Sequence, residues 1–106
     1  MKIIIAKTFN QKLKGLMGKT NINYGMFFPY VNSIHTFFMK EPIDIIGLNK
    51  EMTIMEIHPN ITPNHIVLLH KSIHTLELPL NASNKYKNGQ KININFWPFF
   101  NITMII

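Results

Sequence analysis

The chain has 106 residues, enough for one domain, and the absence of cysteine excludes disulfide bonds, thiolate nucleophiles and cysteine-type zinc sites. Its net charge is +6 and every basic residue is a lysine. Since arginine does most of the bidentate reading of bases and phosphates, nucleic acid is not the expected partner. The apolar run over residues 1–6 stops at Lys7, too short for a secretion signal or a membrane span, so we expect a cytoplasmic protein.

The N-terminal part of the chain predicts a short strand followed by the clearest helix of the protein. An isoleucine-rich run over residues 2–6 is typical of a strand. Thr8 and Gln11 have the spacing of a capping box, which predicts a helix start, and Gly18 provides a stop. The expected apolar face of this helix consists of Phe9, Leu13, Leu16 and Met17.

From Gly25 onward, short runs of β-branched and aromatic residues replace the helical pattern. Two prolines predict a loop over residues 58–64. With one good helix and no repeated strand–helix–strand spacing, the sequence predicts a single, mainly β domain over residues 1–106. The expected architecture is a compact antiparallel sandwich or partly closed barrel of about seven short strands with one N-terminal helix. After the first strand, the strand-like runs are 26–30, 35–40, 43–48, 52–57, 66–69, 73–78 and 91–96.

The tail over residues 97–106 is strongly apolar. We expect it to form a final strand that covers the core. The alternative is an exposed apolar patch, which would support a weak homo-oligomer.

Several segments, in this order and spacing, resemble the domain-of-unknown-function family 192. They are Gly15–Met17, Gly25–Phe28, His35–Lys40, Pro42–Ile46 and Leu76–Pro79. The resemblance covers roughly residues 5–96. It implies a compact, mainly β fold for which no biochemical activity is established.

The candidate site is built around Asp44, the only aspartate of the chain, which stands among isoleucines. If the runs 35–40 and 43–48 are neighbouring strands, Asp44 lies near the level of Met39 and Lys40. We therefore predict a pocket in which His35, Lys40 and Asp44 offer polar groups and Met26 and Met39 form the apolar wall. The alternatives stay open: His35 as a satisfied core residue, and Asp44 as a structural carboxylate bonded to backbone amides.

These residues favour a small-ligand or peptide binding module. The alternative is a hydrolase-like or other enzyme that uses a His35/Asp44 acid–base pair, so enzymatic activity stays an open question. No metal site or cofactor is expected. His70 and His74 are four residues apart, but no glutamate follows His70 as in zinc proteases and His65 lies near a proline-bearing loop, so we expect a solvated loop cluster. No Gly-x-Ser-x-Gly elbow or glycine-rich phosphate loop occurs.

Overall fold

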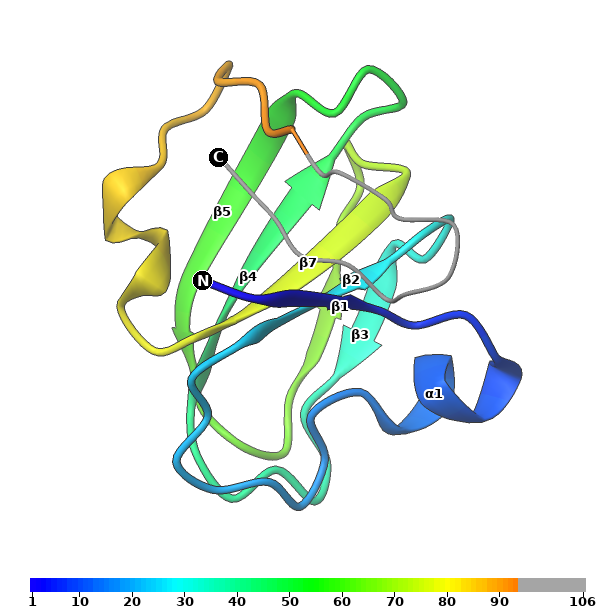
Figure 1. Cartoon of the computed structure of the whole chain (residues 1–106), viewed down its shortest axis with the longest axis vertical. Helices are drawn as coiled ribbons and strands as arrows, with labels where there is room; N and C mark the ends of the chain where they lie inside the picture. Colours follow the sequence, from blue (N-terminus) through cyan, green and yellow to red (C-terminus); the bar gives the residue numbers. More distant parts are fainter. Residues whose placement is uncertain (94–106) are drawn as a thin grey trace.

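The isoleucine- and leucine-rich runs of the sequence form the strands of one larger sheet and one two-stranded sheet (Figure 1). The computed structural model describes residues 1–93 of the chain. The elements are β1 (Ile3–Ile5), α1 (Phe9–Lys14), β2 (Gly25–Phe28), β3 (Ser33–His35), β4 (Ile43–Leu48), β5 (Ile54–Ile61), β6 (Ile66–Leu68), β7 (His74–Pro79) and the 3₁₀ helix η1 (Ala82–Lys85).

The larger sheet has the strand order β1-β2-β7-β4-β5, and β3 pairs with β6 in the second sheet. Only β1 and β2 run parallel, and all other paired strands are antiparallel. The prediction of a mainly β fold with seven short strands and one N-terminal helix is confirmed. Within residues 1–93, β1 and β5 remain separate edges, so the sheet is not closed into a barrel.

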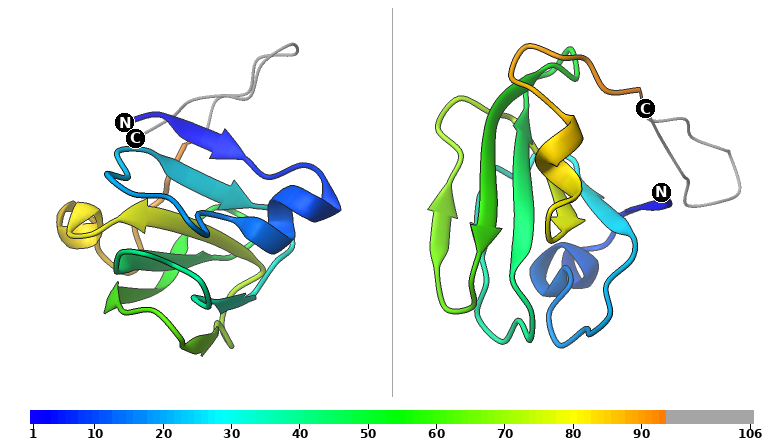
Figure 2. Two further views of the ribbon diagram at one scale, coloured as in Figure 1. Left: turned by 90° about the horizontal axis from the view of Figure 1, so that it is seen from below. Right: turned by 90° about the vertical axis from the view of Figure 1, so that its left-hand side faces the viewer.

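The central strands β4 and β7 are buried on both faces of the sheet. On one face, Ile46 and Leu48 pack in a core that η1 borders through Ala82. On the opposite face, Ile43 and Ile45 pack against the β3–β6 sheet. In the edge-on view at the right of Figure 2, η1 and β6 accordingly lie on opposite sides of β4 and β5. The fold therefore has two separate apolar layers, and a side chain's place along its strand decides which layer it enters.

The predicted helix start is confirmed at atomic detail. The Thr8 hydroxyl accepts a hydrogen bond from the Gln11 N–H at 3.0 Å, and Gln11 Oε1 accepts one from the Thr8 N–H at 3.1 Å. The predicted apolar face is wrong in its first half, because Phe9 is 81% exposed and Leu13 53% exposed. The helix ends at Gly15, whose φ of 50° turns the chain away, and only the following Leu16 is fully buried.

The predicted strand over residues 35–40 is wrong. Strand β3 ends at His35, and Phe38 has a φ of 65°, which a strand does not allow. The turn is held by Thr36, whose Oγ1 donates to the Thr62 carbonyl at 2.8 Å and accepts from the His65 N–H at 2.8 Å.

The predicted loop over residues 58–64 is also wrong in its first half, because β5 continues to Ile61. Pro59 is tolerated there because β5 is an edge strand with a bulge. Ile45 pairs with His58 and Ile43 with Ile61, so Pro59 and Asn60 together lie opposite one residue of β4.

The C-terminal predictions fall largely outside the described residues. In the predicted strand over 91–96, Lys91 forms an isolated antiparallel bridge with Thr53 and Ile92 is buried. Residues 94–106, including the tail 97–106 and its role in a homo-oligomer, lie outside the described part of the chain. Within residues 1–93, no helix has the length and apolar character needed to cross a membrane.

Candidate functional site

A buried carboxylic acid, Glu77, lies at the centre of the sheet. It stands on β7 between Met26 of β2 and Ile45 of β4, its register partners. Only 4% of Glu77 is exposed. The backbone N–H of Leu16 lies near its carboxyl group and acts to lower the carboxyl pKa. Oε1 has no hydrogen-bond partner among residues 1–93.

The surroundings of Glu77 decide its protonation. Burial raises the pKa of the carboxyl from 4.5 to about 8, against the smaller opposite effect of the Leu16 N–H. No cation is paired with it among the described residues. The group is therefore mostly neutral near pH 7, and a neutral carboxyl has one O–H donor.

Glu77 lines a cavity of about 130 Å³, which we call the Glu77 cavity. Its wall also contains Lys14, Met17, His35, Phe37 and Met39. The cavity lies between the C-terminal end of α1, strand β3 and the turn that follows β3.

Gly15 allows the chain to pass close over Glu77. A Cβ atom at this position would lie 3.0 Å from Glu77 Oε1 and 3.1 Å from Phe28 Cζ, and the φ of 50° disfavours any side chain. The backbone of the Lys14–Gly15 turn therefore covers Oε1. Access to this oxygen requires a small rotation of the Glu77 carboxyl or a small shift of that turn.

His35 lines the Glu77 cavity, and one of its ring nitrogens has a defined hydrogen bond. Its Nδ1 accepts a hydrogen bond from the Phe37 N–H at 3.2 Å, and the two rings stack with centroids 5.4 Å apart. In the neutral imidazole, an accepting Nδ1 leaves the proton on Nε2. The free nitrogen of His35 is thus a donor.

The structure places the residues of the predicted site in different parts of the fold. His35 and Met39 both line the Glu77 cavity. Met26 lines a second, more open cavity of about 560 Å³, which shares Lys14, Gly15 and Met17 with the first. Lys40 is exposed and lines neither cavity within the described residues.

Asp44 belongs to the opposite layer and is 1% exposed. Its Oδ1 accepts the Asn60 N–H of the β5 bulge at 2.9 Å. Its Oδ2 accepts the Ser83 N–H at 2.9 Å and the Ser83 hydroxyl at 2.6 Å. These contacts correspond to the structural alternative for Asp44, and the structure does not bring its carboxylate to His35.

Comparison with known proteins shows which family this chain belongs to. The sequence matches the family DUF192, described as Uncharacterized ACR, COG1430, over residues 1–94. The chain belongs to this family. A UPF0127 protein of Thermococcus sibiricus is 34% identical over an alignment of 62 residues that covers 53% of this chain and 40% of that protein. The chain thus covers less than half the length of that relative.

Two solved structures share the fold of this DUF192 chain. A protein of unknown function from Novosphingobium aromaticivorans has a TM-score of 0.75 and 24% identity, covering 84% of this chain and 71% of its own. A protein from Sinorhizobium meliloti, described as a candidate transcription regulator, has a TM-score of 0.75 and 21% identity, covering 82% and 76%. At these identities the likeness concerns the fold alone, and the DUF192 family has no established activity.

Three of the five segments that carry the DUF192 resemblance meet at the Glu77 cavity. Gly15–Met17 forms one wall, His35–Lys40 contributes three lining residues, and Glu77 comes from Leu76–Pro79. Sequence reasoning used these segments to recognise the family, yet it left Glu77 out of the site. The available signal was the same as for Asp44: an acid between apolar neighbours in a strand.

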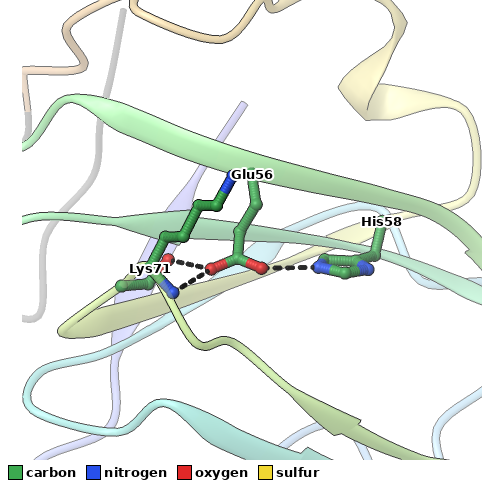
Figure 3. A network of polar contacts seen from close by, with 4 residues as sticks. Glu56, His58 and Lys71 are labelled. Carbon is green, nitrogen blue, oxygen red and sulfur yellow. Dashed lines mark hydrogen bonds and ion pairs between the residues drawn. The ribbon is translucent and has the colours of Figure 1, made fainter.

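A second polar cluster lies at the sheet edge, on β5 and the loop before β7 (Figure 3). Glu56 Oε1 contacts His58 Nε2 at 2.9 Å, and Oε2 accepts from the Lys71 N–H at 2.9 Å and the Ser72 hydroxyl at 2.7 Å. The carboxylate lies between serine and histidine, whereas nucleophile activation needs the histidine in the middle. The cluster therefore ties the loop to β5 and does not form a catalytic triad. Gly47 makes room for it, since a Cβ there would lie 2.0 Å from Ser72 Oγ.

We expect Glu56→Gln to lower the free energy of unfolding by about 1 kcal/mol near neutral pH, because the amide has one oxygen acceptor where the carboxylate uses two. Burial alone would raise the pKa of Glu56, but the hydrogen bonds from His58, Ser72 and Lys71 outweigh it, and the net pKa is lowered. Its contribution is therefore complete above pH 4.5 and is lost as the pH falls through the folded-state pKa. Urea unfolding at about pH 7 and about pH 3 should show the two proteins converging in acid. A constant difference would contradict this role.

Proposed function

We propose that this chain is a binding module that takes a small ligand or a peptide segment at the Glu77 cavity, with Glu77, His35 and Met39 as contacting residues. The chief support is that Glu77 Oε1 is buried and has no hydrogen-bond partner among residues 1–93. A buried polar atom left unpaired costs about 1–3 kcal/mol. A ligand that pairs with it recovers part of that free energy, so the position favours binding over stability alone.

The cavity surroundings support the same proposal. The wall combines the apolar side chains of Met17, Phe37 and Met39 with polar groups that include Glu77 and His35, and convergent polar groups beside apolar side chains are typical of ligand sites. Met26 joins the proposal through the neighbouring cavity, which shares Lys14, Gly15 and Met17 with the Glu77 cavity. Lys40 is not part of the proposed binding site.

An acid–base pair of His35 and Asp44 is not part of this proposal. Asp44 already accepts three hydrogen bonds from Asn60 and Ser83, and no observation favours a reaction at its carboxylate. We place the protein in the cytoplasm, since a chain without cysteine makes no use of an oxidising compartment.

A thermal-shift screen of small organic acids, amines, amides and short peptides tests the proposal on three forms of the full chain. These are the wild type, Glu77→Met and Glu51→Met. Methionine matches the size of glutamate and lacks its polar oxygens, and Glu51 is an exposed acid that serves as the matched control. We expect at least one compound to raise the melting temperature of the wild type and of Glu51→Met while leaving Glu77→Met unchanged. If every shift survives in Glu77→Met, or none occurs, the cavity is not the binding site.

A further inference from the structure

Most polar side chains around the Glu77 cavity are hydrogen-bond donors, and the Ser33 hydroxyl, which also lines it, can donate or accept. The neutral Glu77 carboxyl has one O–H, and its Oε1 is buried without a hydrogen-bond partner among residues 1–93. His35 offers Nε2–H, since its Nδ1 accepts from Phe37. Lys14 can only donate. An occupant that supplies only donors, such as an ammonium group, finds fewer partners here than an acceptor does, because Lys14 and the free nitrogen of His35 only donate.

The charge around the cavity points the same way. Lys12 and Lys14 both line it, and Lys12 is held near the wall by donating from Nζ to the Pro29 carbonyl at 3.2 Å. With Glu77 neutral, the cavity carries positive charge from these lysines and no compensating anion among the lining residues. The net charge of +6 on the whole chain adds a long-range attraction for anions.

We propose that the Glu77 cavity binds a carboxylate group, in a complex where the Glu77 O–H and His35 Nε2–H donate to the ligand's oxygens and Lys14 neutralises its charge. This inference rests on the proposed function and names its ligand class. An O–H donor facing a carboxylate forms a charge-assisted hydrogen bond, which is shorter and stronger than a neutral one.

The size of the cavity limits the ligand. Its volume of about 130 Å³ is close to that of the roughly 150 Å³ engineered cavity that holds benzene. Pockets for drug-sized ligands are larger, at roughly 300–1,000 Å³. The carboxylate therefore belongs to a short aliphatic acid or to the free C-terminus of a polypeptide, whose remaining length would cross the apolar side chains of Leu13 and Phe37 at the cavity.

Binding should depend on pH through Glu77. The charged and titratable groups that face Glu77 are Lys12 and Lys14 from the α1 side and His35 from β3. Its register partners on β2 and β4, Met26 and Ile45, do not titrate. When Glu77 ionises, it loses its donor and repels a second carboxylate. Affinity should therefore fall by at least about tenfold from about pH 6 to about pH 9.

The test compares three probes of matched shape on the full chain: butyrate, butyramide and butylammonium. Butyrate has as many non-hydrogen atoms as benzene and therefore suits this volume. Titrations followed by amide chemical shifts at about pH 6 should show butyrate binding at least about tenfold more tightly than either of the others. Lys14→Gln should weaken butyrate binding. Glu77→Gln keeps a donor and should retain binding without the pH dependence, whereas Glu77→Met should lose binding.

A short peptide ending in valine, with a free or an amidated C-terminus, identifies the source of the carboxylate. Tighter binding of the free peptide than of butyrate indicates a polypeptide C-terminus, and the reverse indicates a small acid. Preferential binding of butylammonium or butyramide to the wild type over Glu77→Met overturns the carboxylate inference and leaves the binding module standing. Failure of all five probes overturns the carboxylate inference. The proposed function is contradicted only if the thermal-shift screen also finds no compound whose binding depends on Glu77.

Discussion

Raising the pH from about 5 to about 9 is expected to destabilise the folded protein by on the order of 4 kcal/mol through Glu77 alone. Burial raises the pKa of this carboxyl to about 8 in the fold, against 4.5 as its ordinary value. Between these two values the folded state keeps a proton that the unfolded state has lost. The contribution of Glu77 is therefore fully present below pH 4.5 and is lost as the pH rises through about 8. Urea unfolding at a series of pH values measures how the free energy of unfolding changes with pH.

Glu77→Gln isolates this effect, because it removes the titration and keeps the size of the side chain. Burial lowers the pKa of His74, whose contribution is present above 6.5 and is lost as the pH falls, opposite in sign to that of Glu77. This and every other titration are common to both proteins, so the difference between wild type and variant should follow Glu77 alone. We expect the variant to gain stability relative to the wild type as the pH rises. Parallel curves would show that Glu77 is not buried as a neutral acid.

Local sequence signals predicted those parts of the fold that depend on neighbouring residues. The Thr8–Gln11 capping box forms with both of its hydrogen bonds, because its partners are three residues apart. Strand β4 has the predicted bounds, because an apolar run that is buried on both faces does not depend on register for its pattern.

Features of the fold that depend on distant segments could not be predicted. Pro59 reads as a strand breaker, yet it lies on an edge strand in a bulge whose free N–H, at Asn60, bonds to Asp44 from sixteen residues away. The run 35–40 looks like a strand, but Thr36 is held in a turn by Thr62 and His65. In both cases a long-range hydrogen bond outweighs the local preference.

The candidate site shows the same limit. Asp44 and Glu77 carry one local signal, an acid between apolar neighbours, and they stand on paired strands. The register places Asp44 opposite Leu78 and Glu77 opposite Ile45, one position apart. Because strand side chains alternate, the two acids point to opposite faces. Only the pairing, which sequence does not reveal, separates the acid with three hydrogen bonds from the acid with an unpaired oxygen.

Asp44→Ala is expected to lower the free energy of unfolding by about 3–5 kcal/mol, the largest effect of any single substitution proposed for this chain. The carboxylate is 1% exposed and accepts from the Asn60 N–H, the Ser83 N–H and the Ser83 hydroxyl. Alanine leaves the two donors of the buried Ser83 and the Asn60 N–H without this acceptor, and it releases both the β5 bulge and the start of η1. Urea unfolding near neutral pH measures the loss.

Asp44→Asn separates the contacts, because its amide keeps one oxygen acceptor and should lose about half as much stability. Ser83→Ala removes only the hydroxyl donor and should cost about 1 kcal/mol. In all three variants, butyrate affinity measured on the folded fraction should stay at the wild-type value, since Asp44 and Ser83 belong to the opposite layer from the Glu77 cavity. A variant that keeps wild-type stability and loses the ligand would instead assign Asp44 to the binding site. The assignment of Asp44 to stability and of Glu77 to binding would then be wrong.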